Sequence, residues 1–245
     1  MARLHVVLLG GFRVQPASGE PLGLPLKKAQ GLLAYLALRP GQWHSREKLA
    51  TLLWGDRADG EARHSLRQAL LTLRKVLPDG RAGLLLVQGE TISLNTASVD
   101  VDAATFERLA AEGTPRSLER AASLYRGDLL EGFVLDEEPF EEWLRVERDR
   151  LRELAIQTLG RRLAHQIGVG AVEAAIQTAG RLLALDPMQE EVHRILMRLY
   201  VRQGRRGAAC RQYQVCLEGL RRELGVEPEA ETIRLYKRLL PQRVH

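Results

Sequence analysis

The chain has 245 residues, of which 45% are hydrophobic and 27% charged, as in a globular protein of one or two domains. No apolar run approaches the roughly 18 residues of a membrane-spanning helix, and the N-terminus lacks the pattern of a signal peptide. The spacing of Cys210 and Cys216 fits neither a CxxC metal site nor a local disulfide. We therefore expect a reduced, cytoplasmic protein without a membrane partner.

The positive charge is concentrated in the first part of the chain. The net charge is +5, but residues 1–95 hold 13 Lys and Arg against 7 Asp and Glu, whereas the remainder holds 23 against 24. An excess of this kind, confined to one part of a chain, indicates a nucleic-acid-binding module joined to a neutral one.

The N-terminal elements are predicted to be short. Residues 4–9, 12–14 and 20–26 read as a weak antiparallel meander punctuated by Gly and Pro. Helical periodicity then marks residues 26–36, 46–53 and 62–77, with Ser45 as the N-cap of the second helix and a polar loop at 54–60. Pro78-Asp79-Gly80 ends the third helix, and strands 84–87 and 91–94 flank a hairpin turn at Gly89.

The third of these helices separates into two faces. Its core-facing stripe holds Leu66, Ala69, Leu70, Leu73, Val76 and Leu77. The neighbouring arc holds Arg63, His64, Arg67, Gln68, Leu71, Arg74 and Lys75, and residues 62–77 contain no acid. An ordinary surface helix mixes both signs, because pairs four residues apart are stabilising. A solvated basic face remains the alternative, but an external polyanion explains the missing acids better.

The order of elements is typical of helix-turn-helix DNA binding, with a supporting helix, a recognition helix and a β-ribbon. We expect Arg63, Arg67 and Gln68 to lie near base edges, because Arg suits guanine and Gln suits adenine. Phosphates or flanking bases would be contacted by the rest of the arc and by residues near the second helix, namely His64, Leu71, Arg74, Lys75, Trp43, Ser45, Arg46 and, more weakly, Lys27 and Lys28.

Everything after the segment 99–102 is predicted to be helical, in segments 103–111, 116–125, 139–167, 171–185, 188–202, 207–224 and 229–239. A repeat signature is visible in Tyr200, Gly204, Ala209, Tyr213 and Cys216, with a weaker copy at Gly170, Ala175 and Pro187. This spacing matches tetratricopeptide helix pairs, whose small residues let helices approach closely. We interpret these residues as packing positions.

Two stretches carry a family resemblance. LPLKKAQGLLAYLALRPGQWHSREKLATLLWGDR, ARHSLRQALLTLRKVL and LLLVQGETISLN resemble the OmpR/PhoB-type winged helix. ASLYRGDLLEGF, EEWLRVERDRLREL, LLALDPMQEEVHRILMRLYVRQGRR and RRELGVEPEAETIRLYKRLL resemble the bacterial transcriptional activation domain. Joined through VDVDAATFE, the whole chain resembles the small SARP-type transcriptional activators.

The resemblance implies an α+β winged-helix domain over residues 1–97 and an all-α, tetratricopeptide-like domain over residues 98–245. It implies binding to direct repeats of double-stranded promoter DNA by side-by-side protomers, with recruitment of RNA polymerase through its sigma factor. In that family the loop between the second and third helices often contacts the polymerase, which here points to Trp54, Asp56, Arg57 and Asp59.

The hairpin departs from the family pattern. Its tip carries Gln88 and Glu90 rather than an obvious Arg, so we expect Thr91 or Arg81 to make only phosphate contacts. No receiver domain precedes the winged helix, so a two-component response regulator is not expected.

Catalysis is not predicted. The six histidines include no pair four residues apart, and nucleotide-binding and nucleophile-elbow motifs are absent, so we expect neither a metal nor a cofactor. Acids between residues 127 and 144, among them Glu131, Asp136, Glu137, Glu138, Glu141 and Glu142, could form a patch for a basic partner or the first turn of a helix; paired catalytic carboxylates are the weaker reading. The alternative function is a tetratricopeptide-like adaptor or sensor.

Overall fold

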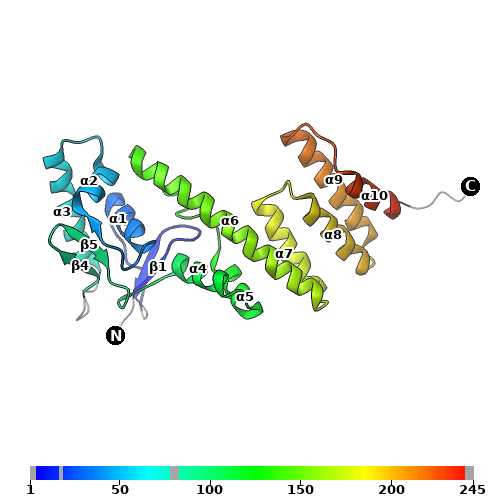
Figure 1. The fold of residues 1–245 in the computed structure, drawn as a ribbon, viewed down its shortest axis with the longest axis horizontal. Helices are drawn as coiled ribbons and strands as arrows, with labels where there is room; N and C mark the ends of the chain where they lie inside the picture. Colours follow the sequence, from blue (N-terminus) through cyan, green and yellow to red (C-terminus); the bar gives the residue numbers. More distant parts are fainter. Residues whose placement is uncertain (1–3, 17–18, 78–82, 241–245) are drawn as a thin grey trace, which may run out of the picture. The chain divides into compact units, whose positions relative to one another are not determined.

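The computed structural model describes residues 4–16, 19–77 and 83–240 (Figure 1). It contains two compact units. The first comprises residues 1–112 and 120–154, and the second comprises residues 113–119 and 155–245. These units cross the expected boundary at residue 97, because residues 120–154 associate with the winged-helix elements. The domain limits 1–97 and 98–245 therefore stay a prediction about the two sequence modules.

A three-stranded sheet opens the first unit. Its strands are β1 (Leu4–Val7), β2 (Arg13–Pro16) and β6 (Val99–Val101), in the order β2-β1-β6. β2 is antiparallel to β1, with Val6 opposite Val14, whereas β6 is parallel to β1, with Leu4 opposite Val99. The connecting segment between the predicted modules is thus itself a strand.

The predicted third strand of the N-terminal meander, residues 20–26, is wrong. The structure has no strand there, although the Leu22 N–H donates to the Val14 carbonyl at 2.7 Å. Pro21 and Pro25 lack the N–H groups that a strand ladder needs. The other edge of β1 is occupied by β6.

The winged helix follows as α1 (Lys27–Ala37), β3 (His44–Ser45), α2 (Arg46–Trp54), α3 (Asp59–Val76), β4 (Leu85–Gln88) and β5 (Thr91–Leu94). Ser45 caps α2 as predicted, since its Oγ accepts from the Lys48 N–H at 3.2 Å. The second sheet has the order β3-β5-β4, so the wing hairpin pairs with the strand that leads into α2. Pro78-Asp79-Gly80 and Arg81 lie outside the described residues.

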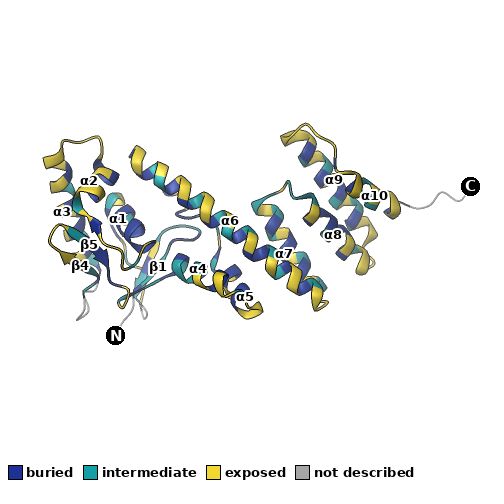
Figure 2. Ribbon diagram, viewed as in Figure 1, coloured by how far each residue is buried: buried dark blue, intermediate teal, exposed yellow. Residues whose placement is uncertain are grey.

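The apolar faces of α1, α2 and α3 form the winged-helix core. Leu32, Leu36, Leu49, Leu53 and Leu73 are fully buried. The predicted stripe of α3 is confirmed at Leu66, Ala69, Leu70 and Leu73, all buried (Figure 2). The helix begins three residues earlier than expected, so its first turn includes Asp59 and Glu61, where carboxylates suit the positive end of the helix dipole.

The chain continues as α4 (Asp102–Glu112), α5 (Pro115–Leu124), α6 (Glu138–Gly168), α7 (Val172–Leu185), α8 (Glu190–Arg202), α9 (Arg206–Glu223) and α10 (Ala230–Leu239). α5 starts as predicted, because Thr114 Oγ1 accepts from the Ser117 N–H at 3.2 Å ahead of Pro115. The beginning of α6 belongs to the first unit, where Phe140 is fully buried against α1 at Gly31.

The second unit stacks helices as the repeat signature predicts. Ala209, Tyr213 and Cys216 are buried, and Tyr213 stacks on Tyr236 of α10 with ring centroids 3.9 Å apart. Gly204 has φ +72°, a left-handed conformation that ends α8 and favours glycine. Burial supports the packing interpretation at Ala175, Ala209, Tyr213 and Cys216. It is wrong for Gly170 and Gly204, which are exposed, have no heavy atom within 4 Å of an added Cβ, and serve as left-handed helix ends.

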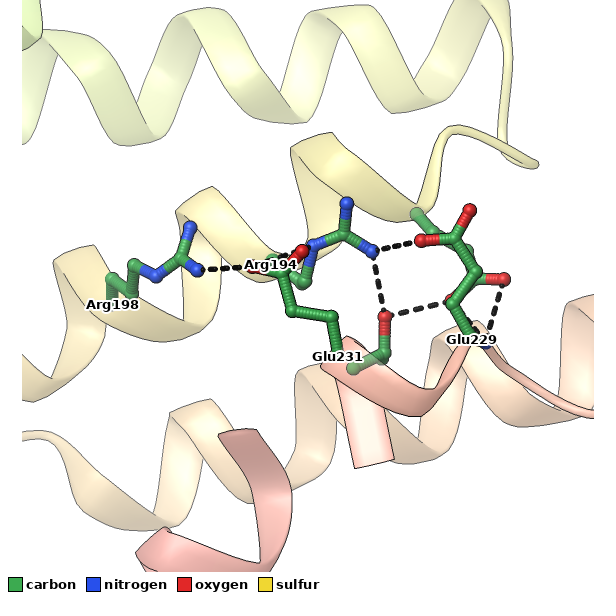
Figure 3. Close-up of polar contacts among 6 residues, drawn as sticks. Arg194, Arg198, Glu229 and Glu231 are labelled. Carbon is green, nitrogen blue, oxygen red and sulfur yellow. Dashed lines mark hydrogen bonds and ion pairs between the residues drawn. The ribbon is translucent and has the colours of Figure 1, made fainter. Parts of the chain in front are cut away.

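Polar contacts hold α10 against α8 (Figure 3). Arg194 of α8 is 9% exposed and its Nη1 donates to Glu229 Oε2 at 2.6 Å, while Arg198 Nη2 lies 2.9 Å from Glu231 Oε1. The Glu190 carboxylate accepts from the Glu229 N–H at 2.9 Å, which supplies a partner for the amino end of α10. α10 is therefore fixed to α8 by ion pairs and by a hydrogen bond to its amino end.

Candidate nucleic-acid interface

The exposed face of α3 carries every residue that the sequence assigned to it. Arg63, His64, Arg67, Gln68, Leu71, Arg74 and Lys75 are all exposed (Figure 2). Their spacing follows the helical period, so they share the side of the helix opposite to buried Leu66 and Leu73. Most of this face is polar or basic, and exposed Leu71 could contact a thymine methyl group.

The arginines and the lysine of this face form no ion pair with an acid in the described part of the chain. Among residues 4–16, 19–77 and 83–240, no ion pair within 4.0 Å involves Arg63, Arg67, Arg74 or Lys75. Elsewhere the chain pairs its arginines freely, for example Arg39 with Glu147 at 2.8 Å and Arg150 with Glu107 at 2.5 Å. The α3 face is therefore left with positive charge for an external anion.

A recess lies between the start of α2, the first half of α3 and the tip of the wing. It has a volume of about 610 Å³, and it is lined by Ser45, Arg46, Glu47, Arg63, Leu66, Arg67 and Glu90. Arginines from two helices thus face one concave surface, as an anion-binding groove requires. The structure thus places Ser45 and Arg46 in the same recess as Arg63 and Arg67.

Glu47 and Glu90 were not expected in this recess. Glu47 lies in the first turn of α2, where its carboxylate suits the helix dipole, and Glu90 lies at the wing tip. The sequence did indicate an unusual wing, because Glu90 stands at the hairpin tip where the related family often has an arginine. Both acids oppose a phosphate at their edge of the recess and so restrict the path that a DNA backbone can take.

Two backbone N–H groups at the amino end of α2 already have acceptors within the protein. The Arg46 N–H donates to the Glu90 carbonyl at 2.9 Å, and the Lys48 N–H donates to Ser45 Oγ at 3.2 Å. Phosphate contacts here must therefore depend on the side chains of Ser45, Arg46 and neighbouring Trp43, whose exposed fraction is 43%.

Lys28 and Thr91 were also expected to contact phosphate, and both side chains have partners within the protein. Lys28 points away from such a role, because its ammonium pairs with Glu137 and lies 5.4 Å from the centre of the Trp54 ring. Thr91 is half-buried, and its Oγ1 donates to the Gln88 carbonyl at 2.8 Å, which stabilises the wing turn. Thr91 therefore contributes to the shape of the wing.

The α2–α3 connection presents three of the four residues named for a polymerase contact. Asp56, Arg57 and Asp59 are exposed, and Arg57 Nη1 donates to Ser65 Oγ at 3.3 Å. Trp54 is only 4% exposed, so its side chain packs beneath the connection and is not accessible to a protein partner.

The described part of the chain shows no metal site and no membrane-spanning helix. Within it, no group of three or more His, Cys, Asp or Glu is placed to hold a metal ion. Cys210 and Cys216 are free thiols. Of the helices in the described ranges, none is both long and apolar enough to cross a bilayer.

The fold and the α3 face together define a winged-helix DNA-binding protein that carries a helical-repeat module. Comparison with known families agrees with this class. Residues 96–240 match the bacterial transcriptional activator domain, and residues 20–90 match the C-terminal domain of transcriptional regulatory proteins. The chain belongs to the SARP family of DNA-binding transcriptional regulators. The α3 face lies within the matched winged-helix region, and the family is regulatory rather than enzymatic.

Individual relatives match most of this chain at low identity. The chain is 27% identical over 241 residues to the regulatory protein AfsR of Streptomyces griseus, covering 97% of this chain but 24% of AfsR. It is 27% identical over 232 residues to the transcriptional regulator RedD of Streptomyces coelicolor, covering 90% of this chain and 66% of RedD. The structure of Mycobacterium tuberculosis EmbR with a low-affinity phosphopeptide has the same fold, with a TM-score of 0.72 at 23% identity, over 98% of this chain and 65% of EmbR.

Proposed function

We propose that this protein activates transcription by binding direct repeats at promoters and recruiting RNA polymerase. The observation that carries the DNA half of the proposal is the exposed basic face of α3, whose arginines and lysine form no ion pair within residues 4–16, 19–77 and 83–240. Arg46 continues this face in the recess beside it. Arg63, Arg67 and Gln68 read base edges, while Arg74, Lys75 and the amino end of α2 contact phosphates. Because promoter DNA is its ligand, the protein acts in the cytoplasm.

The polymerase half of the proposal is supported by the α2–α3 connection. Asp56, Arg57 and Asp59 are exposed at the opposite end of α2 from Arg46. A residue on this connection can therefore reach a protein partner while the amino end of α2 lies against DNA. RNA polymerase, through its sigma factor, is the partner that we assign, and protomers bound to adjacent repeats associate on the DNA.

Binding-site selection on the purified chain, followed by a salt titration on the best site, tests the proposal. We expect a direct repeat spaced by about one helical turn of DNA. If 6–10 phosphates are contacted, affinity should fall roughly 10³–10⁵-fold between 50 and 200 mM salt. Recovery of no preferred sequence, with weak and salt-insensitive binding, would refute it.

The helical half supports a second candidate, an adaptor that binds a protein partner. A groove of about 470 Å³ lies among α7, α8 and α9, and its apolar lining includes Ile176, Leu183, Tyr200 and Val215. Binding in such a groove would respond little to salt, which separates it from DNA binding. The two activities would occupy different modules of the same chain.

A further inference from the structure

One carboxylate from the segment before α6 lies beneath the α2–α3 connection. Glu137 is 5% exposed and belongs to the first unit together with the winged helix. Its Oε2 accepts from the Gly55 N–H at 3.2 Å, and its Oε1 accepts from Lys28 Nζ. A buried carboxylate requires a charged partner and hydrogen bonds, and Glu137 has both.

Gly55 also packs against this segment. A Cβ added at Gly55 would lie 3.5 Å from Pro139 Cγ, which is a van der Waals distance, so the residue that follows α2 contacts both Glu137 and Pro139. Lys28, fixed by Glu137, covers the Trp54 ring at 5.4 Å. Trp54, which ends α2, and Gly55, which follows it, are thus positioned by contacts with Lys28, Glu137 and Pro139.

The exposed part of the connection depends on these buried contacts. The Arg57 N–H donates to the Trp54 carbonyl at 3.2 Å, so the placement of Trp54 and Gly55 is passed directly to Arg57. We propose that Glu137 is a positioning residue, which sets the conformation of the α2–α3 connection and so enables the polymerase contact at Asp56, Arg57 and Asp59. The effect on polymerase contact rests on the proposed function, whereas the effect of Glu137 on the conformation of the connection does not depend on it.

The start of α6 has other attachments, so changes at Glu137 should not detach it. Phe140 is fully buried, and its ring centroid lies 5.1 Å from that of Trp143, which in turn lies 4.9 Å from Tyr35 of α1. Arg39 Nη2 also donates to Glu147 Oε1 at 2.8 Å. Local changes at the Glu137 carboxylate can therefore be separated from loss of the fold.

The test uses the full chain with Lys28→Met and Glu137→Leu combined. This pair keeps side-chain volume and removes both charges, a replacement that is often neutral or stabilising for a buried ion pair. Glu137→Gln keeps an acceptor oxygen for Gly55 and serves as the conservative variant. Glu138→Gln, at the exposed neighbouring acid, is the matched control.

Three measurements decide the outcome. In the double variant, hydrogen exchange at the Gly55 amide should accelerate at least about tenfold. Transcription stimulated at a selected promoter should fall by at least about fivefold, whereas the Kd for promoter DNA should stay within about twofold of the parent. Glu137→Gln should retain much of the parent activity, and Glu138→Gln should match the parent in all three.

Unchanged exchange at Gly55 would overturn the positioning role. Faster exchange with undiminished transcription would overturn the link to the polymerase, while the hydrogen bond would stand. If the unmodified protein bound its promoter but stimulated no transcription, the proposed function would fail, and the exchange result would still decide whether Glu137 sets the connection. Equal losses in DNA affinity and transcription would refute a local effect.

Discussion

Replacement of Arg67 by alanine separates base reading from phosphate binding. Arg67 is exposed on α3, lines the recess with Arg63, and has no ion pair within 4.0 Å in the described ranges. Its removal in the free protein therefore breaks no such pair, and the free energy of unfolding should change by less than about 0.5 kcal/mol. The cost should fall on binding alone.

The size of that cost depends on what Arg67 contacts. A bidentate contact with guanine contributes about 1–3 kcal/mol, so the Kd for the selected site should rise about 5- to 150-fold while the Kd for random DNA changes little. A phosphate contact would weaken both classes of DNA equally and reduce the salt slope by about 1.

Fluorescence anisotropy on paired specific and random duplexes, at four salt concentrations, provides the measurement. Arg211→Ala, at an exposed arginine of α9, is the control and should leave both constants unchanged. A variant at Arg67 that bound both duplexes like the parent would refute the assignment of this face to DNA.

Four other changes test separate features. Glu90→Gln removes an acid from the recess and should tighten binding to any DNA by about two- to fivefold, most clearly at low salt, in the same anisotropy assay. Gly31→Ala would place a Cβ 3.2 Å from Phe140 Cε2. This crowding should outweigh the roughly 1 kcal/mol by which alanine is favoured over glycine inside a helix, so urea unfolding should show a net destabilisation of up to about 2 kcal/mol. Burial, and to a lesser extent nearby cations, lower the pKa of His44 from its usual 6.5, so stability should be fully present above about pH 6.5 and decline as the pH falls; His44→Phe should flatten that dependence in denaturant midpoints. Burial raises the pKa of Cys216 to about 11, so thiol reagents should modify it only in the unfolded protein, as mass spectrometry would reveal.

Local patterns predicted most of the candidate site. The faces of α3 were predictable because one helix carries its own period, and Leu66 and Leu73 on one side place Arg67 on the other. Ser45 was predictable because an N-cap acts within three residues. The family resemblance then supplied the roles that periodicity alone cannot give.

Long-range partners were beyond such reasoning. Glu137 reads in the sequence as one acid in an acidic run, yet it is buried against Lys28, which lies 109 residues earlier. The strand β6 was missed, and its residues were predicted to be a connecting segment, because three residues are too few for a periodic signal. Its parallel partner β1 also lies far away in the sequence, so no hairpin pattern marks the pairing. Burial of Trp54 was also missed, since a polar loop follows it directly.

The attachment of α1 to the start of α6 has a consequence for biosynthesis. Lys28 and Arg39 pair with Glu137 and Glu147, which are made 109 and 108 residues later. At ribosomal rates of about 5–20 residues per second, the interval is roughly 5–20 s. During this time α1, α2 and α3 are already synthesised, but the surface of α1 that contacts the start of α6 is uncovered. A nascent chain would thus pass through a period in which chaperones could bind that surface, and it would complete these contacts only after about a third of the predicted activation module had been translated.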